Sequence, residues 1–163
     1  NYAFGLSYMA VVRDLYRDAP APDRILEWGP GRSTLFFAES FPGVTIDGVE
    51  HHEQWFERCQ LVAEAFPGVA MHLRRLAIAP GRAEGYVTWP LYGGDRYDLI
   101  FIDGRLRCDC AAVAALVLAP GGTVLIHDAH RANYRPAYRL FRSRRIVCDT
   151  AILRDPEIPW RQS

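Results

Sequence analysis

A short segment near the N-terminus constrains the fold more than any other part of the sequence. An apolar run ends at Leu26, Glu27 follows, and residues 29–31 read Gly-Pro-Gly. The apolar run predicts a buried strand, the glycines predict a tight turn, and Ser33 or Thr34 can cap a helix that starts directly afterwards. A strand, a glycine turn and a helix N-terminus together present backbone N–H groups to a small polar ligand in α/β sheets.

The rest of the chain alternates between β-rich apolar runs and amphipathic, helix-type segments. We expect strands at 24–27, 44–49, 69–76, 97–102, 123–126 and 145–153. We expect helices at about 5–17, 34–41, 53–66, 108–118 and 133–142, with 79–95 mostly loop. Short apolar strands that alternate with helices are typical of a parallel sheet covered by helices on both faces. The predicted fold class is therefore α/β, with a doubly wound, mostly parallel sheet.

Length and charge indicate one globular domain without a polyanionic partner. The chain has 163 residues, enough for a substantial core, so we expect a single domain over 1–163. Within it, 1–19 would carry an N-terminal helix, 24–155 the α/β core and 156–163 a tail. The formal net charge is zero, which gives no indication of nucleic acid or of a membrane surface. No apolar run approaches the roughly 20 residues of a membrane helix.

The cysteine spacing gives no motif for a metal or redox site, and the absence of lysine excludes Schiff-base chemistry. The four cysteines form no Cys-x-x-Cys pair and no Cys/His cluster with metal-ligand spacing. Reduced thiols of this kind are typical of a cytoplasmic protein, and we expect that location. The chain contains Arg but no Lys, which excludes a lysine Schiff base.

Acidic residues follow four of the predicted parallel strands. These residues are Glu27, Glu50, Asp103 and Asp128. Ligands bind at the carboxyl ends of parallel strands, and acids near a buried sheet are costly unless a polar group partners them. Glu50 comes nineteen residues after Gly31, about the spacing at which an acid meets ribose hydroxyls in dinucleotide sites. The sequence therefore predicts a site for a nucleoside at this edge of the sheet.

The order of these motifs resembles the class I S-adenosylmethionine-dependent methyltransferases. Thr34 stands where a dinucleotide fingerprint has its third glycine. In contrast, Glu-x-Gly-x-Gly at 27–31, Glu50, Asp103 and Leu-Ala-Pro-Gly-Gly at 118–122 follow the order found in that family. The resemblance covers about residues 20–130, and it depends on the ordered set rather than on one motif.

Two further stretches narrow the resemblance. Ile-Asp-Gly-Arg at 102–105 and Ile-His-Asp at 126–128 look most similar to the small-molecule O-methyltransferases, including the catechol-type enzymes. This implies the Rossmann-like methyltransferase fold, S-adenosylmethionine as cofactor, and methyl transfer to an oxygen, or as a second choice a nitrogen, of a small molecule. Since little sequence follows the fifth strand, we expect the antiparallel strand pair that ends this fold to be shortened or missing.

The resemblance also implies which residues hold the cofactor. The implied cofactor-binding residues are Glu27, Gly29, Gly31, Ser33, Glu50, His51, Asp103 and Gly104. Among them, Glu27 would lie near the methionine ammonium group, Glu50 at the ribose and His51 beside the adenine. Asp103 and Gly104 would lie under the transferred methyl group, although Asp-Gly is equally the sequence of a plain tight turn.

Several groups are candidates for removing the acceptor's proton. They are Asp103, Asp128, His127 and His130, of which His130 has the intrinsic pKa best suited to proton transfer near neutral pH. Metal-dependent relatives have a third ligand where this chain has Ala129, so we expect no metal ligands. Mg²⁺ remains an alternative, since it often needs only one or two carboxylates from the protein.

The C-terminal fifth of the chain is rich in Arg. Arg135, Arg139 and Arg142 are spaced to form one stripe on the predicted helix at 133–142. Arg131 and Arg135 come soonest after the strand-five acid, and guanidinium groups there would suit a carboxylate or phosphate on the acceptor. We therefore expect these two to bind a small anionic acceptor; a solvated basic surface is the alternative.

Two other functions compete with methyl transfer. A nicotinamide-dependent oxidoreductase is disfavoured by Thr34 and by the absence of a Lys that could complete a Tyr-x-x-x-Lys pair. A non-catalytic, cofactor-binding domain is the other, because Ala129 replaces a ligand and the C-terminal part is brief.

Overall fold

A computed structural model describes residues 7–79 and 83–157 of the chain. The strands are β1 (Arg24–Trp28), β2 (Thr45–Glu50), β3 (Ala70–Arg75), β4 (Tyr97–Ile102), β5 (Leu118–Ile126), β6 (Phe141–Val147) and β7 (Thr150–Pro156). The α-helices are α1 (Ser7–Leu15), α2 (Arg32–Ser40), α3 (Glu53–Ala65), α4 (Glu84–Thr88), α5 (Arg107–Val117) and α6 (Arg135–Tyr138). Two short 3₁₀ helices are η1 (Trp89–Leu91) and η2 (Ala132–Tyr134).

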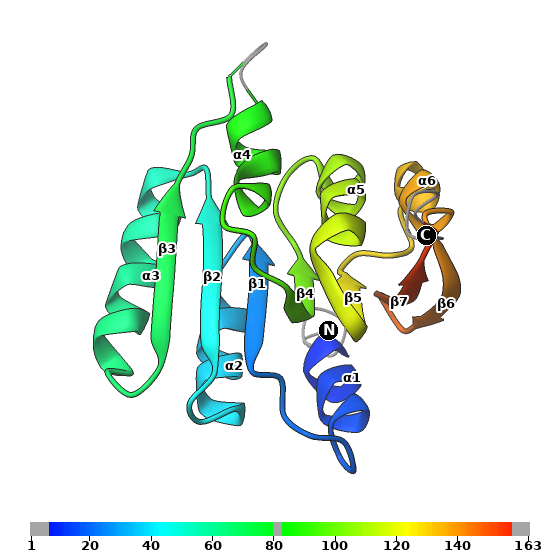
Figure 1. Ribbon diagram of the computed structural model, residues 1–163. Coiled ribbons are helices and arrows are strands. Elements are labelled where there is room, and N and C mark those ends of the chain that lie inside the picture. The colour runs from blue at the N-terminus through cyan, green and yellow to red at the C-terminus, as the bar shows by residue number, and fades with distance from the viewer. Residues whose placement is uncertain (1–6, 80–82, 158–163) are drawn as a thin grey trace.

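All strands belong to one sheet in the order β3-β2-β1-β4-β5-β7-β6 (Figure 1). The first five strands in the sequence pair in parallel, whereas β7 runs antiparallel to both β5 and β6. The chain starts in the middle of the sheet at β1, builds outward to β3, and returns to add β4 beside β1. The predicted doubly wound, mostly parallel sheet is confirmed, and the strand order reverses between β1 and β4.

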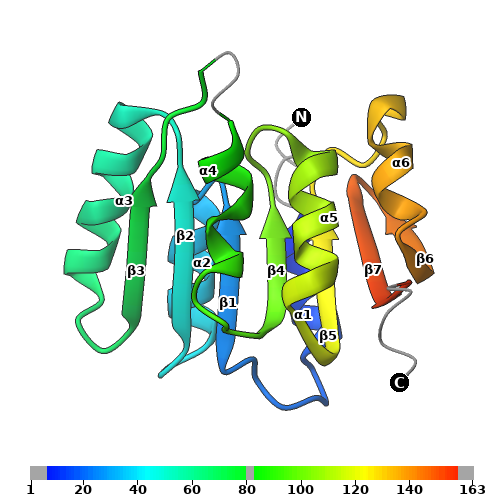
Figure 2. The same ribbon diagram turned by 45° about the horizontal axis from the view of Figure 1, so that its top comes forward.

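Side chains of the central strands alternate between two cores. Ile100 and Ile102 of β4 belong to the cluster under α4 and α5, whereas Leu99 and Phe101 belong to the cluster under α1 and α2. Figure 2 shows α4 and α5 in front of the sheet and α1 and α2 behind it. Because both faces are covered, the central strands are continuous apolar runs, which is why the sequence identified them.

One segment predicted as loop contains helices. The stretch 79–95 forms α4 and η1, while residues 80–82 lie outside the described residues. Tyr86 of α4 is fully buried, and its backbone oxygen accepts a hydrogen bond from Trp28 Nε1 at 3.0 Å. The prediction of loop was wrong because tertiary burial of Tyr86 and Val87 outweighs the local effect of the glycines and prolines.

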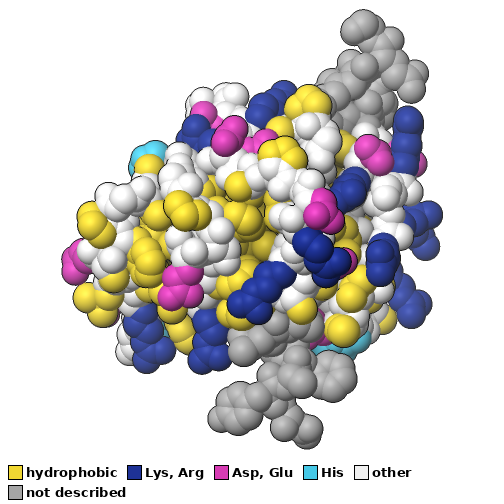
Figure 3. Space-filling model, turned by 90° about the horizontal axis from the view of Figure 1, so that it is seen from below, with side chains coloured by type: hydrophobic (Ala, Val, Ile, Leu, Met, Phe, Trp, Pro, Cys, Tyr) yellow, Lys and Arg dark blue, Asp and Glu magenta, His cyan; other side chains and the backbone are white. Residues whose placement is uncertain are grey.

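The C-terminal strand pair is present, although its sequence pattern was misread. The helix expected over 133–142 is reduced to α6, and the single strand expected over 145–153 is two strands, β6 and β7. They are joined by a tight turn at Cys148 and Asp149, in which Cys148 has a φ of 53°. No glycine or asparagine marks this turn. Figure 3 shows Arg side chains gathered on the side of the molecule that carries β6 and β7.

The helices of the described residues are all shorter than a membrane span. None of them combines the length and the apolar character that crossing a bilayer requires. On α3 only Cys59 is buried, whereas Trp55 and Leu61, which the sequence pattern placed on an apolar side, are exposed.

Candidate active site

The site lies where the strand order reverses, at the carboxyl ends of the parallel strands. Backbone hydrogen bonds continue the sheet one residue beyond its strands. The N–H of Gly29 donates to Val49 O at 3.0 Å, and that of Asp103 donates to Trp28 O at 2.9 Å. The N–H of His127 donates to Ile102 O at 3.2 Å. The loops after β1, β4 and β5 therefore leave the sheet side by side.

A large cavity opens above these loops. Its volume is about 1080 Å³, enough for a ligand of nucleoside size together with a small acceptor. The lining residues are Tyr8, Gly29, Pro30, Gly31, Arg32, Ser33, Glu50, His51, Trp55, Arg58, Asp103, Gly104, Arg105, Leu106, Arg107, Cys108, Asp109, Arg131, Asn133 and Tyr134. Most of the residues predicted to hold the cofactor are thus brought together.

The glycine turn has two glycines in different situations. Gly29 has a φ of +86°, and a Cβ there would meet the backbone N of Gly104 at 2.6 Å. A Cβ on Gly31 would meet nothing within 4 Å, because this residue faces the cavity. Helix α2 begins at Arg32, so neither predicted cap is the N-cap; Thr34 Oγ1 instead accepts a hydrogen bond from Gly31 N at 2.9 Å.

Glu27 lies beneath the turn and is fully buried. Burial raises the pKa of Glu27 to about 7, while the nearby hydroxyls of Ser33 and Thr34 oppose this rise. Among the described residues no donor makes a well-directed hydrogen bond to either carboxylate oxygen. An acid in this position is costly on its own, which makes it a candidate partner for a cationic ligand group.

Glu50 is held rigidly at the cavity wall. Its Oε1 atom accepts hydrogen bonds from the backbone N–H groups of His51 and His52, both at 2.7 Å. The His51 ring lines the cavity, with Nδ1 2.8 Å from the same oxygen but at an angle unsuited to a hydrogen bond. Because these contacts occupy Oε1, Oε2 is the oxygen best placed for a ligand.

Ionisable groups cluster at the ends of β4 and β5. Asp103 Oδ1 lies 3.0 Å from Nδ1 of His127 and 2.9 Å from Nη2 of Arg107. Nε2 of His127 lies 3.3 Å from Asp149 Oδ2, in the β6–β7 turn. Burial lowers the pKa of His127, but the carboxylates of Asp103, Asp149 and Asp128 outweigh that effect, so the pKa is raised. The imidazole is therefore held in its charged form to a higher pH than usual.

Sequence reasoning missed several residues of this site. Arg107 is buried at the start of α5, and Tyr8 of α1 lines the cavity, where burial raises its pKa above the usual range. Trp55 and Arg58 on α3 also line the cavity, with the Arg58 guanidinium 4.8 Å from the Trp55 ring centre. A signal existed only for Arg107, which follows Asp103 by four residues and can therefore reach it from one helical turn.

Asp128, His130 and Arg135 are predicted site residues that lie outside the cavity lining, as Glu27 and His127 also do. Asp128 is turned toward Arg107 and Arg131, and its φ of 56° is left-handed. His130 and Arg135 are exposed and do not line the cavity. Arg131 does line it, with Nη2 2.9 Å from Asp128 Oδ2.

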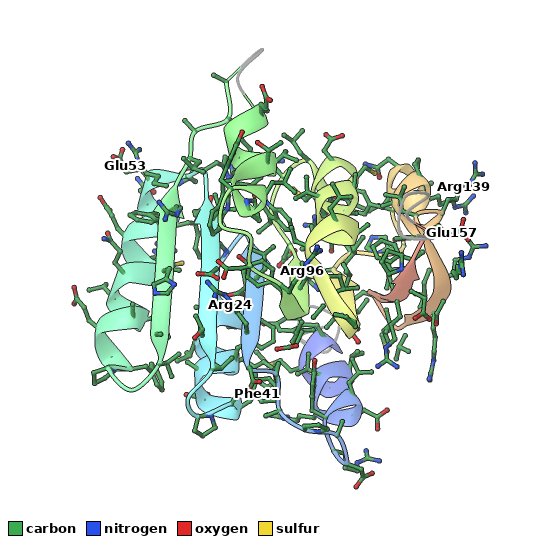
Figure 4. All side chains as sticks on the ribbon, viewed as in Figure 1. Arg24, Phe41, Glu53, Arg96, Arg139 and Glu157 are labelled. Atoms are coloured by element: carbon green, nitrogen blue, oxygen red, sulfur yellow. The ribbon has the colours of Figure 1, made fainter. Side chains whose placement is uncertain are left out.

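The predicted stripe of Arg residues does not exist. It required one helix through Arg135, Arg139 and Arg142, but α6 ends at Tyr138 and Arg142 belongs to β6. Arg139 points away from the sheet at the outer end of the molecule (Figure 4). The prediction of one helix was wrong because Phe141 is buried in the core as the first residue of β6.

The sheet order, the reversal beside the glycine turn and the antiparallel C-terminal pair define the Rossmann-like fold of class I methyltransferases, which confirms the predicted fold. A methyltransferase-like protein from Silicibacter pomeroyi has 22% identity and a TM-score of 0.77, over 92% of this chain and 85% of that one. A putative caffeoyl-CoA O-methyltransferase from Staphylococcus aureus has 13% identity and a TM-score of 0.65, over 90% and 81%.

Another structural neighbour is an enzyme that methylates RNA rather than a small molecule. A T. thermophilus 16S rRNA methyltransferase, solved with AdoMet and guanosine, has 21% identity and a TM-score of 0.67, over 92% of this chain and 42% of that one. No protein-family model matches the sequence, and no curated protein matches it. At these identities the similarity establishes the fold and leaves the acceptor open.

Proposed function

We propose that this protein transfers a methyl group from S-adenosylmethionine to an oxygen of a small, anionic molecule. The observation that carries the proposal is the cavity at the reversal of strand order, where Gly31, Glu50 and Asp103 face one space. Solved structures that share this fold include one methyltransferase in complex with AdoMet and one in complex with S-adenosyl-L-homocysteine, which supports the cofactor class.

The residues of the cavity fit this cofactor. Gly31 leaves open space beside the backbone, and the buried Glu27 carboxyl lies below the turn without a well-directed hydrogen bond, which suits an ammonium group above it. Ser33 adds a hydroxyl at the same turn. Glu50 is positioned for ribose hydroxyls and His51 for the edge of the adenine. Gly29 and Gly104 contribute differently: because they lack side chains, the loops after β1 and β4 can come into contact.

When bound, S-adenosylmethionine supplies a methyl group on a positively charged sulfur. The protein then has to align the acceptor oxygen with that methyl group, and alignment can lower the barrier by roughly 7–11 kcal/mol. Asp103 would accept the proton that the acceptor hydroxyl loses when it takes up the methyl group. We place Asp103 first among the candidate bases because it lines the cavity; Asp128 and His130 do not.

An anionic acceptor is supported by the cations at the cavity. Arg32, Arg58, Arg105 and Arg131 line it. Arg131 is 53% exposed, so part of its guanidinium is free to meet a carboxylate or phosphate. Arg131→Ala should raise the acceptor's KM about tenfold and leave cofactor affinity unchanged. Arg135→Ala is the comparison: an equal rise there would support the sequence-based proposal that both residues bind the acceptor, and no rise in either would exclude the anionic acceptor.

The cofactor proposal is tested by calorimetric titration with S-adenosylmethionine, S-adenosylhomocysteine and NAD. We expect the first two to bind in a 1:1 complex and NAD not to bind. Tighter binding of NAD would favour the oxidoreductase alternative, and tight binding without turnover of any hydroxyl-bearing acceptor would favour a non-catalytic domain. The described cysteines are all free thiols, which supports a cytoplasmic location for this reaction.

A further inference from the structure

Arg107 holds the ends of β4 and β5 together. Its side chain is only 8% exposed, although it lines the floor of the cavity. Nε donates a hydrogen bond to Gly104 O and Nη2 donates one to Asp103 O, both at 3.0 Å. Nη1 donates to the backbone oxygen of His127. The guanidinium therefore bridges the two loops that carry the acids of the site.

The same guanidinium lies between the two carboxylates. Nη2 is 2.9 Å from Asp103 Oδ1 and 3.3 Å from Asp128 Oδ2. Its other face packs on the Tyr134 ring, 5.1 Å from the ring centre. These contacts use nearly all of its N–H groups, so Arg107 has little capacity left to bind an acceptor. Its role is to position other groups.

A divalent cation at the ends of β4 and β5 would compete with Arg107 for the same two carboxylate groups. Within the described residues, Asp103, His127 and Asp128 form a group whose ligand atoms lie within 4.8 Å of one another, as a metal site requires. Arg107 Nη2 is paired with Asp103 Oδ1 and with Asp128 Oδ2, and Asp128 Oδ2 is also paired with Arg131. A metal ion there would meet two guanidinium groups at close range, so these residues do not fit a metal while Arg107 is in place.

We propose that the Arg107 guanidinium takes the place of a divalent cation between Asp103 and Asp128, fixing both acids and excluding metal ions from the site. The exclusion of metal stands on the geometry alone. Its catalytic consequence rests on the proposed methyl transfer: the acceptor proton goes to a carboxylate held by Arg107 rather than to a group on a bound metal. Lys could not substitute fully, because an ammonium group lacks the planar fork that reaches both loops.

Backbone strain around Arg107 supports the same conclusion. Leu106, directly before Arg107, has a φ of 53°, and Asp128 has a φ of 56°. Left-handed backbone is unfavourable for residues other than glycine and persists where surrounding contacts enforce it. Asp128 is paired with the guanidinium and Leu106 directly precedes Arg107 in the chain, so both left-handed residues lie in the loops that Arg107 bridges.

The test is a titration with Mn²⁺, followed by electron paramagnetic resonance, on the wild-type protein and on variants. Wild type should bind no stoichiometric Mn²⁺ below about 1 mM. Arg107→Met should gain one site with at least tenfold higher affinity, and adding Asp128→Asn should abolish that site. Arg107→Lys keeps a cation in place and should stay free of metal. Arg131→Met is the matched control, because it also loses a partner of Asp128 but retains Arg107.

Two results would overturn the proposal. One is stoichiometric Mn²⁺ binding by wild type that Asp128→Asn abolishes; the other is a folded Arg107→Met protein that binds no Mn²⁺. Circular dichroism establishes folding, and Arg107→Gln replaces Arg107→Met if the latter does not fold. S-adenosylhomocysteine binding is measured on the same samples, so failure of the cofactor proposal is seen separately from failure of the metal-exclusion proposal.

Discussion

Gly29 and Gly31 stand two residues apart in one turn, yet different constraints act on them. Gly29 has a left-handed φ and touches the backbone of Gly104, so a side chain there would push apart the loops after β1 and β4. Gly31 has an extended φ of 173° that any residue can adopt, and open space beside it. Only a ligand in the cavity would require a glycine at Gly31.

Substituting these two glycines should separate folding from binding. Gly31→Ala should change the free energy of unfolding by no more than about 0.5 kcal/mol but weaken S-adenosylhomocysteine binding at least tenfold. Gly29→Ala should lower the free energy of unfolding by about 1–3 kcal/mol, because of its backbone conformation and the contact with Gly104. Urea unfolding and calorimetry measure the two effects. Normal binding by Gly31→Ala would show that the cofactor lies elsewhere.

Glu27 should make cofactor binding depend on pH. Since burial raises its pKa to about 7, the free protein holds a proton there at pH 6, and an ammonium group bound nearby must displace it. S-adenosylhomocysteine affinity should therefore rise roughly tenfold between pH 6 and pH 7.5, and Glu27→Gln should bind weakly with a flat profile. A wild-type profile that matches the variant would remove Glu27 from the site.

The same shift has a consequence for stability in the absence of ligand. The folded pKa lies above the unfolded value of 4.5, so the folded state binds more protons than the unfolded state between these pH values. The contribution of Glu27 to stability is therefore complete below about pH 4.5 and is lost as pH rises through about 7. Urea unfolding at pH 5 and 7.5 should show a loss for wild type that is smaller in Glu27→Gln.

At the scale of residues, the sequence could predict the parts of the site that backbone order determines. Glu27, Glu50 and Asp103 follow strands, and parallel strands bring their carboxyl ends to one edge. Arg107 was missed although it follows Asp103 by four residues, because that spacing does not show that the side chain is buried against two loops. His130 was favoured for its intrinsic pKa, but the loop after β5 leaves it exposed.

At the scale of elements, α4 positions the loop after β4. A Cβ on Gly104 would meet the Tyr86 hydroxyl at 2.1 Å, and the same hydroxyl accepts a hydrogen bond from Arg105 N at 3.3 Å. Tyr86 is fully buried, so its ring cannot swing away. The helix therefore limits both the sequence and the shape of the loop that carries Asp103.

A double-mutant cycle tests this contact between α4 and the loop. Gly104→Ala should destabilise the protein by about 2 kcal/mol, and Tyr86→Phe by about 1 kcal/mol. Together they should cost less than the sum by roughly 1 kcal/mol, because removing the hydroxyl makes room for the new methyl group. Thermal and urea unfolding provide the energies, and strict additivity would mean that the loop moves independently of α4.

The elements that the sequence could predict were those with a clear pattern of their own. Buried parallel strands read as apolar runs, so β1 to β4 were predicted to within one residue of their bounds, whereas β5 begins at Leu118, five residues before its predicted start at Thr123. Strands β6 and β7 were predicted as a single strand because the turn between them lacks glycine and β6 is rich in Arg. Helix α4 was missed because its formation depends on Tyr86 reaching the core, a tertiary effect with no local signature.

At the scale of the whole molecule, the structure shows where the Arg residues near the C-terminus lie. The net charge is zero, but Arg142, Arg144 and Arg145 are exposed on β6, the terminal strand of the sheet. This is the side of the molecule on which Arg side chains gather in Figure 3. β6 contributes nothing to the lining of the cavity. An edge strand offers unpaired backbone groups to other chains, and charged side chains on the edge discourage such pairing. We therefore assign these residues to keeping the sheet edge free rather than to the acceptor.

Replacing Arg142, Arg144 and Arg145 by Thr, a residue that favours strands, should make the protein self-associate. Sedimentation velocity should show wild type unchanged with concentration and the triple variant shifting to larger species as concentration rises, since neutral β-branched residues make the edge competent for pairing. S-adenosylhomocysteine affinity should stay within about twofold, because β6 lies outside the cavity.

Single-stranded RNA, titrated at about 150 mM salt, should bind neither protein more tightly than the roughly 10⁻⁴–10⁻⁶ M of non-specific contacts. A variant that stays monomeric but loses tight RNA binding seen in wild type would instead make this edge an acceptor surface.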